Sequence, residues 1–124
     1  MDSSTLNRWL NENVADTRRP GPPSGRRYAV PFARVWDEMR AIVDDRWGWE
    51  MAHADETRGL ATVTCRTPVL PFVDDLAVWV SLDDDGFTSV EARSRSRVGV
   101  GDLGVNRRRI QRLLGNLDER LGVD

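Results

Sequence analysis

Apolar residues in this chain follow two spacings, either every second position or every third and fourth position. Alternation is typical of a strand with one buried face, whereas the wider spacing is typical of an amphipathic helix. The wider spacing predicts helices over residues 31–45, where Pro31 suits the first turn, and over residues 106–121. Alternation predicts strands over residues 26–30, 47–55, 60–67, 76–82 and 87–97.

This order of elements predicts an α+β domain, in which two helices cover one face of an antiparallel sheet. The arrangement of one strand, one helix, four strands and a last helix resembles helix-grip and TBP-like folds, which host many functions. We expect the domain to span residues 26–124 and residues 1–25 to form an arm with a Pro- and Gly-rich linker. Helical spacing within the arm predicts a short helix that carries Leu6, Trp9, Leu10 and Val14.

The turn between the last two strands fixes which side chains share a face. A three-residue loop over residues 84–86, with Gly86 left-handed, makes Asp83 and Phe87 partners and places Val80 opposite Val90. A two-residue loop would put the arginines of the last strand on the apolar face, at a high cost in desolvation. The sequence therefore favours the three-residue loop.

Arginine then occupies alternate positions of the last strand, followed by a glycine-rich turn and a helix that begins with more arginines. Positive charge gathered at the positive end of a helix dipole suits a bound phosphate or carboxylate. The candidate residues of this anion site are Arg93, Arg95, Arg97, Asn106, Arg107 and Arg109. The alternative is internal compensation, in which Asp75 and Glu91 pair with the arginines across strands and Asp102 or Asn106 caps the helix.

Two further patterns suggest function. The connection over residues 67–75 carries Val69, Leu70 and Phe72, which form either an interaction loop or a lid over the domain's own core. Its Asp74 and Asp75 could act with Arg97 in an enzyme, although no histidine or metal-ligand motif accompanies them. Trp79 shares the face of the arginines and could stack on one of them.

Composition removes several classes of function. All 18 basic residues are arginine, so lysine chemistry is excluded, and the net charge of −2 argues against a nucleic-acid partner. Cys65 is the one cysteine of the chain, which excludes an internal disulfide, and His53 is its one histidine. We expect both side chains to be packed, with His53 on one strand face beside Trp47, Trp49 and Met51. We expect no metal, no cofactor and no membrane span. The N-terminus lacks the pattern of a secretory signal, which favours a cytoplasmic location.

Three stretches resemble the domain-of-unknown-function 1499 family, which occurs mainly in bacteria. They are Arg27-Tyr-Ala-Val-Pro31 with Val35-Trp36, then Phe72-Val-Asp-Asp75, and Arg93-Ser-x-Ser-Arg-x-Gly-x-x-Asp-x-Gly-x-Asn-x-x-Arg-Ile110. The resemblance implies no activity and no catalytic residue. The residues favour a non-catalytic domain that binds an anionic small molecule or an acidic protein segment. The alternative is an interaction or homodimerisation module that docks through residues 69–73.

Overall fold

The computed structural model describes residues 14–67, 72–97 and 104–123. Along the chain it contains β1 (Val14–Asp16), β2 (Arg26–Tyr28), α2 (Phe32–Asp45), β3 (Trp49–Asp55), β4 (Leu60–Arg66), β5 (Val73–Leu82), β6 (Thr88–Ser96) and α3 (Val105–Arg120). The predicted order of strands and helices is confirmed, and β1 is an addition to it.

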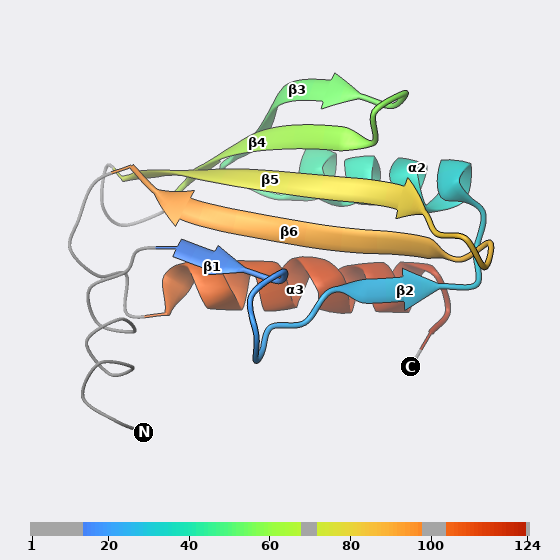
Figure 1. The fold of residues 1–124 in the computed structure, drawn as a ribbon. Helices are drawn as coiled ribbons and strands as arrows, with labels where there is room; N and C mark the ends of the chain where they lie inside the picture. Colours follow the sequence, from blue (N-terminus) through green and yellow to red (C-terminus); the bar gives the residue numbers. More distant parts are fainter. Residues whose placement is uncertain (1–13, 68–71, 98–103, 124) are drawn as a thin grey trace.

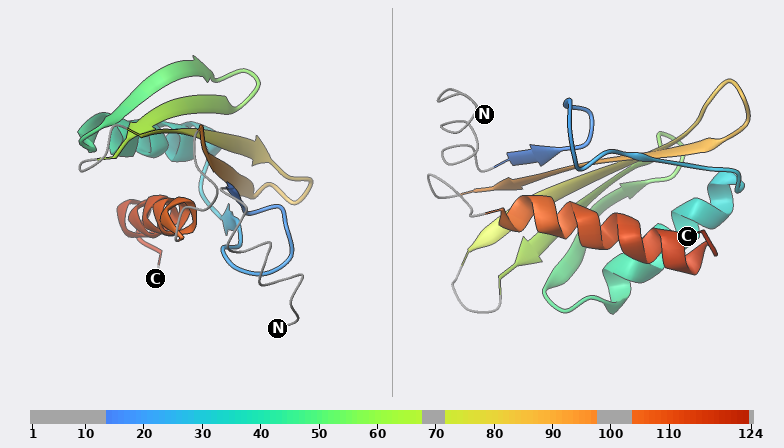
Figure 2. Two further views of the ribbon diagram at one scale, coloured as in Figure 1. Left: turned by 90° about the vertical axis from the view of Figure 1, so that its left-hand side faces the viewer. Right: turned by 90° about the horizontal axis from the view of Figure 1, so that it is seen from below.

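All strands pair antiparallel in one six-stranded sheet with the order β1-β6-β5-β4-β3. The short strand β2 also pairs with β6, so β1 and β2 lie one after the other along the same edge (Figure 1). The sheet curves, and both helices lie on the same side of it (Figure 2). The α+β prediction with two helices on one face is confirmed.

The core lies between this face and the two helices. On α2 the buried stripe is Val35, Trp36, Met39, Ile42 and Val43, and on α3 the buried apolar residues are Ile110, Leu113, Leu114 and Leu117. The facing strand residues include Leu76, Val78 and Val80 of β5 and Val90 and Ala92 of β6. The opposite face of the sheet carries no described helix and is the open face of the molecule.

The predicted hairpin register is confirmed. Val80 pairs with Val90 and Asp75 pairs with Arg95. The Asp83 N–H donates to Phe87 O over 2.8 Å, which closes the loop on the expected pair. Gly86 has a φ of 83°, the left-handed conformation that this loop requires.

Three local predictions are wrong. Val14 lies in β1 and not in a helix, while the rest of the predicted arm helix falls on residues 1–13, outside the described residues. Trp47 precedes β3 and is 70% exposed. A β-bulge between Met51 and His53 shifts the alternation, so His53 points to the open face and is exposed. Cys65 is buried, as predicted.

Candidate functional site

The residues of β6 alternate between two environments. Ser94 and Ser96 are buried beneath α3, whereas Arg93, Arg95 and Arg97 project from the open face. The arginine ladder, defined here as these three arginines, therefore lies on the other side of the sheet from Asn106 and Arg109. The structure divides the candidate anion residues into two separate groups.

The group beneath α3 is a buried polar network. Arg109 Nη1 lies 2.7 Å from Asp74 Oδ2, and these side chains are only 8% and 3% exposed. Arg109 also donates to Ser94 Oγ over 3.1 Å and to Asn106 Oδ1 over 2.8 Å. The Asn106 Nδ2 amide donates to Ser96 Oγ over 2.9 Å. These contacts occupy Asn106 and Arg109 within the fold.

The sequence contained two signals for this network. Asn106 and Arg109 fall on the same helical stripe as Leu113 and Leu117, at spacings of three and four residues. The second signal is the alternation of the strand, which extends further back than predicted, because β5 begins at Val73 and not at Leu76. Successive strand residues face opposite sides, so Asp74 turns inward and Asp75 outward. The two aspartates do not share one site.

On the open face, Asp75 compensates the end of the arginine ladder. Arg97 donates from Nε and Nη2 to the two Asp75 carboxylate oxygens over 2.9 and 2.8 Å. These hydrogen bonds hold the pKa of Asp75 below its ordinary value. Both side chains remain more than half exposed, at 53% and 56%, so water screens the pair.

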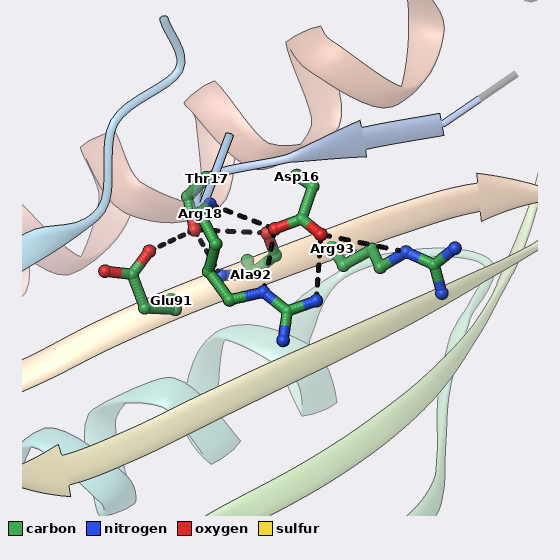
Figure 3. A network of polar contacts seen from close by, with 6 residues as sticks. All are labelled: Asp16, Thr17, Arg18, Glu91, Ala92 and Arg93. Atoms are coloured by element: carbon green, nitrogen blue, oxygen red, sulfur yellow. Dashed lines mark hydrogen bonds and ion pairs between the residues drawn. The ribbon is translucent and has the colours of Figure 1, made fainter. Parts of the chain in front are cut away.

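Arg93 is less well compensated. Its Nε lies 3.8 Å from Asp16 Oδ2, but Asp16 already accepts two hydrogen bonds from the Arg18 guanidinium, at 2.9 and 2.8 Å (Figure 3). The hydrogen bonds from Arg18 lower the pKa of Asp16. The Arg18 guanidinium also lies 4.2 Å above the centre of the Trp79 ring, so this tryptophan does stack on an arginine, though not one of the ladder. Asp16 is therefore paired mainly with Arg18, and it compensates the charge of Arg93 only weakly.

Arg95 occupies the middle of the ladder. It stands opposite Asp75 on β5 and Val14 on β1, and its side chain is exposed. Its cross-strand neighbour Asp75 is bonded to Arg97. Within the described parts of the chain, Arg95 has no ion pair or hydrogen bond through its guanidinium.

Glu91 contacts a different partner from the one expected. Its carboxylate accepts a hydrogen bond from the Thr17 hydroxyl and makes no ion pair with the ladder in the described chain (Figure 3). Thr17 also joins the backbone of β6, because its N–H donates to Ala92 O over 2.9 Å. The turn after β1 is thereby fastened over β6.

The remaining predicted residues lie around the start of α3 and the end of β4. Gly104 is the N-cap of α3, so Asn106, which lies inside the helix, does not serve as the cap. Arg107 is half-buried in the first turn, and Phe72 is 43% exposed. Asp102, Val69 and Leu70 lie outside the described residues.

Two further features, a cluster of metal ligands and a membrane-spanning helix, are absent from the described residues. Among them, no three His, Cys, Asp or Glu side chains come together as potential metal ligands. No helix in the described ranges is long and apolar enough to span a membrane.

Comparison with known proteins gives a family and a distant structural likeness. No curated protein matches the chain. The crystal structure of CalU16 from Micromonospora echinospora aligns with a TM-score of 0.44 and 12% identity, over 92% of this chain and 97% of that one. The family described as "Protein of unknown function (DUF1499)" matches residues 23–117, and the chain therefore belongs to this family.

Proposed function

We propose that this protein is a non-catalytic domain that binds an anionic group on the open face of its sheet. The group is a phosphate or carboxylate, carried by a small molecule or by an acidic protein segment. The observation that supports this proposal is the incomplete compensation of the arginine ladder. Asp16, the acid that pairs with Arg93, is bonded to Arg18, and Arg95 has no ion pair within the described chain.

The spacing of Arg93 and Arg95 suits one shared oxyanion. Residues two apart on a strand point to the same face about 7 Å apart, which lets two guanidinium groups converge on one anion. Arg93 stands opposite Ala77, whose short side chain leaves room between Asp75 and Trp79. An acidic segment could also contact Arg97 by displacing its exposed pair with Asp75.

The expected affinity is modest. Two hydrogen bonds to a charged group contribute roughly 1.5–3 kcal/mol each, so a bare phosphate should bind with a Kd on the order of 1 mM. Salt should weaken this binding, because the site is exposed and screened over about 10 Å at 0.1 M ionic strength.

Calorimetric titration with inorganic phosphate at low salt tests the proposal. Arg95→Gln should weaken binding by at least about tenfold, since it removes one charge-assisted contact. The matched control is Arg40→Gln on the exposed side of α2, which changes the net charge equally and should leave the affinity unchanged. Equal weakening by both variants would show a general charge effect and contradict a site at Arg95.

A second candidate function is docking through the connection between β4 and β5. The exposure of Phe72 favours it, because this apolar side chain is available to a partner. If the protein self-associates in light-scattering measurements, Phe72→Asp should abolish the association without unfolding the domain. Association that survives this substitution would rule out docking at Phe72.

A further inference from the structure

The two helices leave a cleft at their C-terminal ends, on the side of the sheet opposite the arginine ladder. Its volume is about 290 Å³, and it is lined by Ile42, Asp45, Arg46, Asn116, Glu119 and Arg120. Ligand pockets occupy about 300–1,000 Å³, so this cleft is at the lower limit and suits a small molecule. It shares no residue with the site proposed on the open face.

One of the two arginines that line the cleft is compensated. Arg120 donates to Glu38 over 3.3 Å and to Asp45 over 2.9 Å. Asp45, one of the two acids that line the cleft, is therefore already in an ion pair. The other acid, Glu119, is exposed and forms no ion pair with Arg46 in the described chain.

Arg46 is the uncompensated cation of the cleft. It follows the last residue of α2, is only half-exposed, and makes no ion pair within the described residues. Its guanidinium lies 4.7 Å above the centre of the Trp49 ring. This stacking fixes the direction of the guanidinium but does not neutralise its charge.

Further positive charge lies close to Arg46. Burial lowers the pKa of Arg46, and the charges of Arg112 and Arg109 lower it further. Arg109 is neutralised by Asp74, but Arg112 is exposed and has no ion pair in the part of the chain described. Arg112 precedes Asn116, which lines the cleft, by four residues, so both lie on the same side of α3.

We propose that this cleft is a second binding site, for a small organic anion that carries a phosphate or carboxylate group. Arg46 and Arg112 bind the charged group, the Asn116 amide supplies a hydrogen bond, and Ile42 contacts the carbon skeleton. These two arginines have no acidic partners among the residues that the structure describes, so they repel each other. A bound anion would instead attract both of them.

Two tryptophans allow the two proposed sites to be observed separately by NMR. The indole N–H of Trp49 reports on the cleft through Arg46, and that of Trp79 reports on the open face. The signals are assigned with Trp49→Phe and Trp79→Phe. The probes are inorganic phosphate, glycerol 3-phosphate and glycerate, of which the last two distinguish a phosphate from a carboxylate on similar carbon skeletons.

We expect the Trp49 signal to shift saturably with at least one organic probe. Arg46→Gln and Arg112→Gln should each raise the Kd obtained from this shift by about tenfold or more. Arg40→Gln and Arg95→Gln are the matched controls and should leave it unchanged, whereas Arg95→Gln should abolish the response of Trp79.

The absence of a saturable Trp49 shift at concentrations far above about 1 mM would overturn the cleft proposal. The same conclusion would follow if Arg46→Gln and Arg112→Gln bound the probes as tightly as the unaltered protein. Neither result would affect the proposal for the open face, because that proposal is judged from the response of Trp79 and its loss in Arg95→Gln.

Discussion

Asp74 and Asp75 are adjacent in the chain, yet their charges have very different environments. Asp74 faces α3 and forms a buried ion pair with Arg109, whereas Asp75 faces solvent and pairs with Arg97. Removing one partner of a buried pair leaves an uncompensated charge in the interior. An exposed pair loses little, because water solvates the charge that remains.

We therefore predict that Asp74→Asn lowers the free energy of unfolding by about 3–5 kcal/mol. The matched substitution Asp75→Asn should lower it by less than about 1 kcal/mol. Urea denaturation at neutral pH measures both changes. Similar losses for the two variants would contradict the different burial of the two ion pairs.

The buried thiol of Cys65 predicts an alkaline loss of stability. Burial raises its pKa to about 12 from an ordinary value of 9.0, so the unfolded chain releases this proton at a lower pH than the folded chain does. The contribution to stability is complete below pH 9.0 and is lost as the pH rises toward 12. Burial also raises the pKa of Tyr28, which acts in the same direction.

The free energy of unfolding should therefore fall between neutral pH and about pH 10.5, and should fall less in Cys65→Ala. Urea denaturation of both proteins at the two pH values measures the difference. A stability that stays constant or rises over this range, or an equal fall in Cys65→Ala, would contradict the assignment to Cys65.

At the scale of elements, two glycines with equal space around them should respond to alanine in opposite directions. A Cβ atom at Gly86 or at Gly115 would meet no atom within 4 Å. Gly86 has a φ of 83° in the hairpin loop, where a side chain costs about 1–2 kcal/mol. Gly115 lies within α3, where alanine is favoured over glycine by about 1 kcal/mol.

We predict that Gly86→Ala lowers the melting temperature and that Gly115→Ala raises it. Differential scanning calorimetry on the two variants provides the measurement, and each variant is the control for the other. A lower melting temperature for Gly115→Ala would show that α3 needs glycine at this position for a reason other than space.

The elements that the sequence predicts well are those with one strong pattern. The hairpin of β5 and β6 was predictable in register, because the competing two-residue loop would bury the arginines. Both helices were predictable from their apolar stripes. The reversal at His53 was not, because a bulge inserts one residue into an alternation that otherwise looks regular. The exposure of Trp47 was not either, because this residue lies in the turn before β3 and outside the strand.

At the scale of the whole molecule, charge compensation could be predicted only in part. The alternation of faces along the strand would have separated Asp74 from Asp75, and the apolar stripe of the helix would have placed Arg109 inside. The contacts of Asp16 with Arg18 and Arg93 depend on β1, three residues that pair with β6 from a distant part of the sequence. No local pattern indicates this pairing, and it decides which arginines remain available.

The division of arginines between the two faces is the central feature of the molecule. Arg109 stabilises the interior through Asp74, while Arg93 and Arg95 stay incompletely neutralised on the open face. If this face binds anions, a tetrahedral oxyanion should bind between these two side chains at concentrations near its Kd of about 1 mM.

The most direct test is a crystal structure of the protein soaked in selenate, a tetrahedral oxyanion whose selenium gives an anomalous signal. We predict an anomalous peak on the open face within hydrogen-bonding distance of both Arg93 and Arg95, and its loss in crystals of Arg95→Gln. An open face without such a peak, in crystals where no neighbouring molecule covers these residues, would contradict the proposed function.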